Sequence, residues 1–190
     1  MSNIPNAIEP SLPPEAQDME AQLAEVAGQW IGALDGQGLS GAYARALWLY
    51  DRLIANVAPG EADSAYAALV EGSASAVGYA RAYEVLMTAA GIECVTLSGG
   101  ANTWNLAKLD GAWTHIDAYM DDAAQSFGLH FALTDGAMAR DHSWDGSGMP
   151  ACSDATNHYF VREKGYIPFD GTDALRALLS ACLLYTSRCV

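Results

Sequence analysis

The dipeptide Asp110-Gly111 constrains the fold of this chain more than any other feature of the sequence. It joins two segments that are typical of β-strands, "NTWNLAKL" at 102–109 and "AWTHIDAY" at 112–119. Asp-Gly between two such segments is the strongest short-range signal for a β-hairpin with a two-residue turn. A third strand-like run, "IECVTL", occupies residues 92–97. Because strands joined by so short a turn run antiparallel, the sequence predicts an antiparallel sheet.

Helical patterns fill the part of the chain that precedes this sheet. Apolar residues recur at helical spacing in three long segments, and a shorter helix is predicted between the second and the third. These predicted helices cover residues 15–34, 39–57, 64–69 and 76–90. Helices followed by an antiparallel sheet predict an α+β fold, in which a central helix beginning near Ala76 packs against the three strands. Beyond the sheet, residues 158–161 ("HYFV") are predicted as a short strand and residues 172–181 as a helix.

The charge of the chain limits its partners. With 23 acidic and 9 basic residues, the formal net charge is −14. Binding to phosphate requires patches of lysine and arginine, so the composition argues against a nucleic-acid partner and against binding to anionic membranes. No run approaches the roughly 20 apolar residues of a membrane-spanning helix. An apolar content of 51% is sufficient for a buried core.

The two ends of the sequence are expected to lie outside the folded domain. Residues 1–15 are rich in proline, asparagine and serine and predict a loose arm, without the basic start and apolar run of a signal peptide. Residues 182–187 can be encoded by a string that matches a transposon end used as a sequencing adapter. We therefore expect residues 182–190 to be translated adapter and residues 16–181 to be one domain. The compartment stays open, because a cytoplasmic protein and a piece of a longer protein are both compatible with these ends.

Cysteine and histidine spacing predicts neither a disulfide framework nor a metal site. Without the adapter-like end, two cysteines remain, Cys94 in an apolar run and Cys152 in a long loop. His142 and His158 lie in or just after the same loop, but without recognisable metal-ligand spacing. We expect no metal and no cofactor.

The hairpin register places two polar side chains within reach of each other. If the turn is Asp110-Gly111, Trp104 lies opposite Asp117. Asn102 then shares a strand face with Trp104 and is a diagonal neighbour of Asp117, at a spacing of roughly 7–8 Å. A histidine at the first position and an acid at the second would form a base and the carboxylate that orients it. The sequence instead has asparagine at 102.

Three segments, in this order and spacing, resemble the bacterial transglutaminase-like domains, which are relatives of the papain-type cysteine proteases. They are "SASAVGYARAYEVLMTAAGIECVTLSGG", "NTWNLAKLDGAWTHIDAYMDD" and "TDGAMARDHSWDGSGMPACSD", and the resemblance runs from about Leu39 to Phe160. It implies a papain-like fold of the transglutaminase type and a Cys-His-Asp triad that attacks amide carbonyls. In this sequence the cysteine position of that triad is Ala76, the histidine position is Asn102, and the aspartate position is Asp117.

The first two of these positions predict loss of the reaction. Alanine cannot attack a carbonyl, and asparagine cannot take up a proton near neutral pH, so the nucleophile and the base are both missing. The resemblance therefore implies a pseudoenzyme with a degenerate triad and a retained cleft, in which Asp117 is hydrogen-bonded to Asn102 and to nearby backbone. Its ligand would be a peptide, another protein or a cell-wall fragment.

Two alternative functions stay open from the sequence alone. The chain could be an active amide hydrolase or acyl transferase that uses Ser75, one residue before Ala76, or His115, which shares a strand face with Asp117. It could also be a purely structural module within a longer protein.

Four aromatic or acidic residues near these positions are expected to line the cleft or to serve in packing. Trp104 is expected in the core or in the wall of the cleft, and Tyr66 in the cleft or in helix packing. Trp144 and Asp145, in "DHSWD", resemble a family segment for which we expect a structural role.

Overall fold

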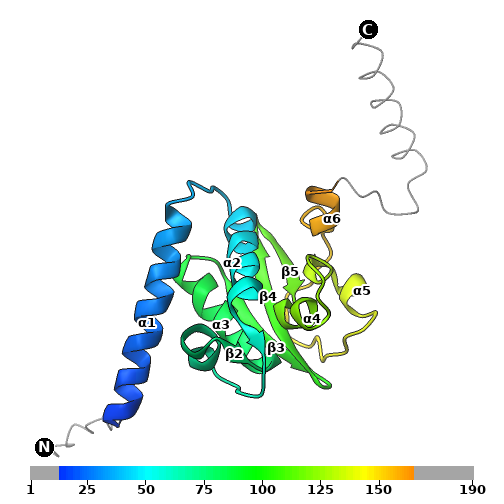
Figure 1. Ribbon diagram of the computed structural model, residues 1–190. Helices are drawn as coiled ribbons and strands as arrows, with labels where there is room; N and C mark the ends of the chain where they lie inside the picture. The colour runs from blue at the N-terminus through cyan, green and yellow to red at the C-terminus, as the bar shows by residue number, and fades with distance from the viewer. Residues whose placement is uncertain (1–12, 165–190) are drawn as a thin grey trace, which may run out of the picture.

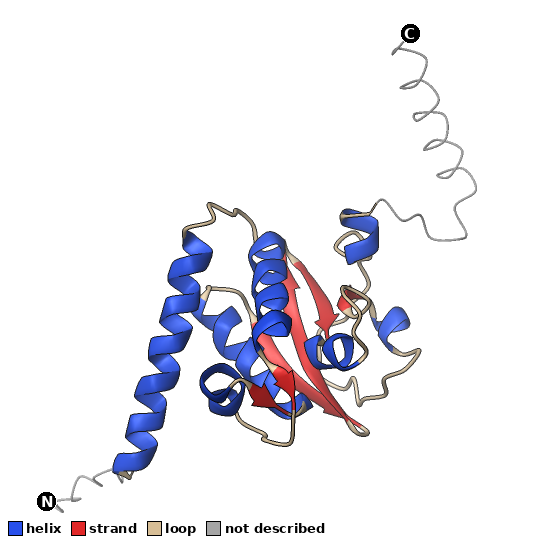
Figure 2. Ribbon diagram, viewed as in Figure 1, coloured by secondary structure: helices blue, strands red, loops and turns tan. Residues whose placement is uncertain are grey.

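Seven helices and six strands make up the part of the chain that the computed structural model describes, residues 13–164 (Figure 1). The helices are α1 (Pro14–Asp35), α2 (Ala42–Asn56), the π-helix η1 (Ala67–Glu71), α3 (Ala76–Ala89), α4 (Ala118–Ala123), α5 (Asp135–Met138) and α6 (Tyr159–Arg162). The strands are β1 (Ala58–Pro59), β2 (Ser73–Ala74), β3 (Cys94–Gly99), β4 (Asn102–Leu109), β5 (Ala112–Ile116) and β6 (Phe131–Leu133). Figure 2 shows the strands gathered in the middle of the domain with helices around them.

An antiparallel sheet with the strand order β3-β4-β5-β6 forms the centre of the domain. The predicted hairpin is present, with Leu109 paired to Ala112 across the Asp110-Gly111 turn. Helix α3 packs on β4 and β3, and β1 and β2 form a separate short parallel pair. The predicted α+β class, with N-terminal helices and a central helix on an antiparallel sheet, is confirmed.

The predicted strand at 112–119 is too long, because β5 ends at Ile116 and helix α4 begins at Ala118. The Asp117 side chain ends the strand by capping α4, where its Oδ1 accepts a hydrogen bond from the Met120 N–H at 2.9 Å. Ladder pairing between β4 and β5 therefore stops at Asn105 and Ile116, and Asp117 has no strand partner on β4.

The predicted strand at 158–161 is wrong, since this segment contributes to helix α6. The imidazole of His158 caps it by accepting a hydrogen bond from the Phe160 N–H. The other elements differ from prediction by a few residues: the helix predicted at 64–69 is the π-helix η1, and the strand predicted at 92–97 is β3. The predicted helix at 172–181 and the adapter-like segment at 182–190 lie outside the described residues, as do residues 1–12 of the predicted arm.

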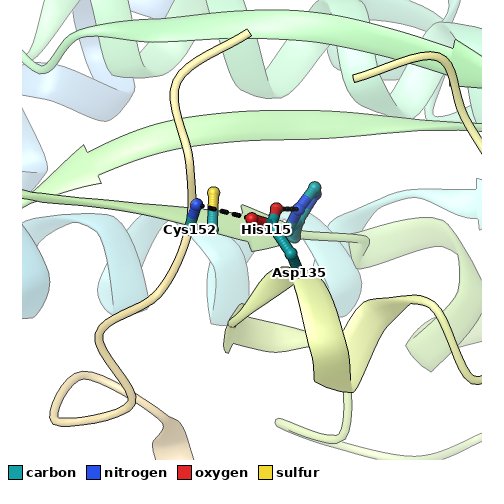
Figure 3. Close-up of side chains that lie close together, drawn as sticks. All are labelled: His115, Asp135 and Cys152. Atoms are coloured by element: carbon teal, nitrogen blue, oxygen red, sulfur yellow. Dashed lines mark hydrogen bonds and ion pairs between the residues drawn. The ribbon is translucent and has the colours of Figure 1, made fainter. Parts of the chain in front are cut away.

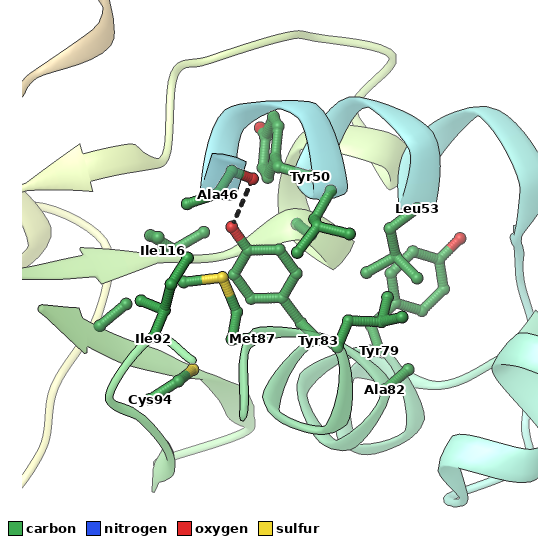
Figure 4. Close-up of a cluster of buried hydrophobic side chains, with 14 of the residues drawn as sticks. Ala46, Tyr50, Leu53, Tyr79, Ala82, Tyr83, Met87, Ile92, Cys94 and Ile116 are labelled. Atoms are coloured by element: carbon green, nitrogen blue, oxygen red, sulfur yellow. Dashed lines mark hydrogen bonds between the residues drawn. The ribbon is translucent and has the colours of Figure 1, made fainter. Parts of the chain in front are cut away.

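The core lies between α3, α2 and the sheet (Figure 4). Tyr83 of α3 is fully buried, and its hydroxyl donates a hydrogen bond to the Ala46 carbonyl of α2 at 2.8 Å. Leu86 and Met87, one turn further along α3, are also fully buried in this cluster. The tyrosine thus combines a large apolar surface with a satisfied polar group, which fixes the distance between the two helices.

Helix α1 covers one flank of this core with a single apolar stripe. Its buried residues are Ala27, Trp30 and Leu34, and the guanidinium carbon of Arg52 on α2 lies 5.0 Å from the centre of the Trp30 ring. Within residues 13–164, no helix combines enough length with enough apolar character to cross a bilayer.

The hairpin turn also holds the start of helix α2. Asp110 adopts a positive φ of 48°, and its Oδ1 accepts hydrogen bonds from the backbone N–H groups of Ala42 and Tyr43 at 2.8 and 3.3 Å. Its other oxygen pairs with the Arg162 guanidinium at 2.9 Å. A residue distant in sequence therefore supplies the N-terminal cap that α2 lacks in its own sequence, where Gly41 occupies the cap position.

Candidate functional site

Strand alternation divides the side chains of β4 between two faces of the sheet. Asn105 points to α3: its Nδ2 donates to the Ala80 carbonyl at 2.9 Å, and the residue is only 2% exposed. Trp104 points the other way, and its indole N–H donates to His115 Nδ1 on β5 at 2.9 Å. Because pairing from β3 to β4 is regular throughout, Asn102 shares the face of Trp104 and not the face that α3 covers.

The nucleophile position implied by the resemblance lies at the first residue of helix α3. Ala76 is half-buried there, directly after Ser75, which caps the helix by accepting a hydrogen bond from the Gly78 N–H at 3.4 Å. The Ser75 hydroxyl in turn donates to Asp63. Among residues 13–164, no hydrogen bond links Ser75 to a histidine, so the group beside this hydroxyl is the Asp63 carboxylate and not an imidazole.

The three triad positions are not joined by hydrogen bonds in this structure. Within the described residues, no such bond connects Asn102 to Asp117 or either of them to Ala76. The predicted bond from Asp117 to backbone is present, to Met120, but the predicted Asn102 bond is replaced by one from His142 Nε2 to Asp117 Oδ2 at 2.9 Å. That the three positions share one cleft stays a prediction.

Asp117 is one end of a chain of alternating carboxylates and imidazoles. The chain runs Asp121, His130, Asp141, His142, Asp117, and each neighbouring pair is hydrogen-bonded. The four nitrogen–oxygen distances in that order are 2.7, 3.0, 2.6 and 2.9 Å. We call this set the carboxylate–histidine chain. Its members come from three separate segments after β5, so it holds the start of α4, the residue before β6 and the loop after α5 to one another.

Both imidazoles of the carboxylate–histidine chain favour the protonated form. Burial alone would lower the pKa of His130, but the hydrogen bonds to Asp121 and Asp141 outweigh it and raise that pKa to about 9. The pKa of His142 is raised for the same reason, because Asp117 and Asp141 accept from its two nitrogens against the effect of burial. With both nitrogens donating, neither ring has a lone pair with which to accept a proton from a nucleophile.

A second cluster, on the same face of the sheet, brings together His115, Asp135 and Cys152 (Figure 3). The imidazole Nε2 donates to Asp135 Oδ1 at 2.9 Å, and Asp135 Oδ2 accepts from the backbone N–H of Cys152 at 3.0 Å. Since an indole N–H can only donate, the bond from Trp104 makes His115 Nδ1 an acceptor, and the ring proton therefore lies on Nε2.

This Cys-His-Asp cluster lacks the arrangement of a catalytic triad. His115 has both nitrogens occupied, and burial lowers its pKa despite the bond to Asp135, which keeps the ring neutral. Burial, together with the nearby Asp135 carboxylate, raises the pKa of the Cys152 thiol to about 12, so the thiolate is absent near neutral pH. The cluster anchors the loop that carries Cys152 to β5.

The two predicted cleft aromatics are engaged in packing. Tyr66 donates its hydroxyl to Gln22 Oε1 of α1 at 2.9 Å. Trp104 is 1% exposed and contacts both histidine clusters, with ring-centre distances of 4.8 Å to His142 and 6.2 Å to His115. Its ring centre also lies 5.8 Å from that of Trp144. Trp144 thus lies against the Trp104 ring, and the structural role expected for it stays a prediction.

Sequence reasoning missed His130, Asp121 and Asp141 altogether, and it considered His142 only for a metal site. One signal was available, because "DHSWD" places Asp141 and His142 side by side within a segment of the resemblance. Nothing in the spacing indicates that this segment returns to Asp117.

The sequence matches no protein-family model, and no curated protein matches it. Two solved structures are similar in part. The first is a transglutaminase (TGase), with a TM-score of 0.48 and 10% identity, covering 60% of this chain and 34% of that protein. The second is a candidate protease from Parabacteroides distasonis, with a TM-score of 0.41 and 13% identity, covering 52% of this chain and 25% of that protein. This chain thus spans about a third of the length of the first protein and a quarter of the second.

Proposed function

We propose that this chain is a transglutaminase-like domain that has lost amide chemistry and serves as a binding module. The proposal starts from the sequence resemblance, which puts Ala76 and Asn102 at the nucleophile and base positions. The observation that carries it is that every candidate substitute is already engaged. The Ser75 hydroxyl bonds to Asp63, and His115 is held by two partners in a buried site.

The remaining candidates are engaged in the same way. His142 donates from both nitrogens to carboxylates, and Cys152 is a buried thiol with a raised pKa. Covalent catalysis requires a nucleophile beside a base with a free lone pair. Of the candidates named here, only Ser75 has such a neighbour, the exposed Asp63 carboxylate, and a carboxylate is a much weaker base toward a hydroxyl than an imidazole, which favours binding over catalysis.

An amine-incorporation assay tests the loss of activity. The unmodified chain, the single variants Ala76→Cys and Asn102→His, and the double variant are incubated with a glutamine-containing peptide and a fluorescent amine. We expect background incorporation in the unmodified chain and in both single variants. Incorporation above background by the unmodified chain overturns the proposal.

The double variant tests whether the triad positions are assigned to the correct residues. Activity in this variant, and its loss when Asp117→Asn is added, would support the assignment of all three positions. If the double variant folds, as judged by circular dichroism, and stays inactive, the retained cleft is contradicted while the absence of activity in the unmodified chain still stands.

A surface pocket beside the second cluster is the place that we propose for a peptide ligand. It has a volume of about 370 Å³ and is lined by Asp135, Trp144, Gly146, Met149, Pro150 and Ala151. An aromatic ring, an exposed methionine and a carboxylate suit a peptide with an apolar and a basic side chain, and the net charge of −14 favours such a partner. Titration with Leu-Lys peptides, followed by tryptophan fluorescence, tests this; equal affinity in Trp144→Ala would contradict it.

A further inference from the structure

Three side chains of the carboxylate–histidine chain converge on one point at the surface. His130, His142 and Asp141 each offer one ligand atom, and these three atoms lie within 4.8 Å of one another. The Asp141 carboxylate bridges the two rings, with Oδ2 at 3.0 Å from His130 Nε2 and Oδ1 at 2.6 Å from His142 Nδ1. Its side chain is 42% exposed, so solvent reaches this point, whereas both imidazoles are buried or nearly so.

Behind each imidazole stands a buried carboxylate that accepts from the opposite ring nitrogen. Asp121 Oδ1 lies 2.7 Å from His130 Nδ1, and Asp117 Oδ2 lies 2.9 Å from His142 Nε2. The side chains of Asp121 and Asp117 are 0% and 4% exposed. Histidines that bind metals almost always donate their other N–H to such a group, which fixes the ring orientation and makes the metal-binding nitrogen more basic.

We propose that His130 Nε2, His142 Nδ1 and Asp141 form a binding site for Zn²⁺, with a fourth position open to water. Two imidazoles and one carboxylate are ligands that zinc takes in open sites, and imidazole nitrogens favour zinc over magnesium or calcium. Zinc replaces the protons on His130 Nε2 and His142 Nδ1, and these two protons pass to solvent. This proposal is independent of the proposed binding function.

The geometry requires little rearrangement to accept the ion. Tetrahedral coordination with bonds of about 2.0–2.1 Å places ligand atoms roughly 3.3–3.4 Å apart. The three donor groups, now within 4.8 Å, need to approach by about 1 Å or somewhat more. The Asp141 oxygens already lie 3.0 and 2.6 Å from the two ring nitrogens, so Asp141 turns slightly outward to admit the ion. The approach falls on the two rings, which pivot while they keep their hydrogen bonds to Asp121 and Asp117.

The second cluster of potential ligands, His115, Asp135 and Cys152, does not meet the same requirement. Zinc on His115 Nε2 would leave the ring proton on Nδ1, directly opposite the Trp104 indole N–H. Two donors would then face each other in a buried site, which costs the hydrogen bond and leaves both groups unsatisfied. The test can therefore separate the two clusters.

Zinc titration of the full chain in competition with a chelating dye tests the proposal. We expect one equivalent to bind the unmodified chain, about 100-fold weaker binding for Asp141→Asn, and about 10- to 100-fold weaker binding for Asp117→Asn, which removes the carboxylate behind His142. The matched control is Asp145→Asn, an exposed acid of the same loop that takes no part in the chain of bonds. It should bind zinc as the unmodified chain does.

Two further arms keep the result unambiguous. Cys182→Ser with Cys189→Ser excludes binding by the terminal cysteines, and Cys152→Ala reports on the second cluster. Cobalt substitution should give the visible bands of tetrahedral nitrogen and oxygen ligands without a sulfur charge-transfer band. Failure of the unmodified chain to bind zinc overturns the proposal, as does equal affinity in a folded Asp141→Asn variant or loss of binding in Cys152→Ala.

Discussion

Replacement of Asp110 by alanine should destabilise the domain more than its partly exposed position suggests. The side chain caps helix α2 through two backbone N–H groups, pairs with Arg162, and belongs to a residue with φ of 48°. Alanine removes both sets of bonds and also tolerates the left-handed conformation poorly. Three separate contributions are therefore lost in one substitution.

The magnitude follows from these three contributions. Loss of an N-terminal cap costs about 0.5–2 kcal/mol, a left-handed conformation costs about 1–2 kcal/mol for a residue with a Cβ, and a largely exposed ion pair contributes about 0.2–1 kcal/mol. Asp110→Ala should thus lower the free energy of unfolding by about 2–5 kcal/mol. Asp110→Gly keeps the backbone freedom and should cost about 1–2 kcal/mol, whereas Asp110→Asn keeps the cap acceptor and the turn and should cost about 1 kcal/mol or less.

Urea unfolding, followed by tryptophan fluorescence, measures the three variants under one condition. The reasoning predicts the order of damage alanine, glycine, asparagine, with unchanged dependence on urea concentration. If asparagine were as damaging as alanine, the charge would matter more than the cap and the turn, and this account would be refuted.

The dependence of the free energy of unfolding on pH, below neutral pH, provides a further check on the role of Asp110. Burial alone would raise the pKa of Asp110, but hydrogen bonds from Arg162 and from the Tyr43 and Ala42 N–H groups outweigh it, so the pKa lies below its usual value. A lowered folded pKa contributes stability that is present above the unfolded value of about 3.9 and is lost as pH falls through the folded value. Asp110→Asn should therefore reduce stability near pH 6 and converge with the unmodified chain at the most acidic pH.

Three other predictions concern single side chains. Gly78→Ala should lower the free energy of unfolding by about 1–3 kcal/mol, and with it the melting temperature, because a Cβ there would come within 2.6 Å of the Ala74 methyl group. Gly28→Ala is the control: a Cβ there meets nothing within 4 Å, so the melting temperature should stay unchanged or rise slightly. Tyr83→Phe should cost about 0.5–1.5 kcal/mol in urea unfolding, since it removes the buried hydroxyl that donates to the Ala46 carbonyl of α2; a neutral effect would contradict the helix-spacing role. Cys152 should resist iodoacetamide in the folded chain and react once urea is added, as measured by peptide mass spectrometry, because burial raises its pKa to about 12; rapid labelling of the folded chain would show that the thiol is accessible.

Local sequence signals accounted for most of the fold. The Asp110-Gly111 hairpin formed in the predicted register because a two-residue turn fixes pairing through chain geometry alone. The end of β5 was predicted too late because Asp117 fits the alternating strand pattern and is also a favourable helix N-cap residue. In the structure it caps α4, where it accepts a hydrogen bond from the Met120 N–H. Helix α6 was missed for a similar reason, since four residues rich in aromatic side chains have no periodicity that separates strand from helix.

The site was harder to predict than the fold. Asp117 was singled out from its place in the hairpin, but its actual partner, His142, lies in an irregular segment whose path no periodic pattern specifies. The same holds for His130 and Asp141, whose pairing depends on how the chain after β5 returns to the sheet. The sequence identifies these residues as titratable, but only the folded structure shows which of them are hydrogen-bonded to one another.

The way in which the segment after β5 is attached has a consequence for its motion. An apolar contact tolerates sliding, because many neighbouring arrangements bury nearly the same area. The buried ring of His142 holds two carboxylates, and any shifted arrangement would strand a charge away from water at a cost of several kcal/mol. This segment is therefore expected to detach as one cooperative unit or to stay in place, with few intermediate positions between the two.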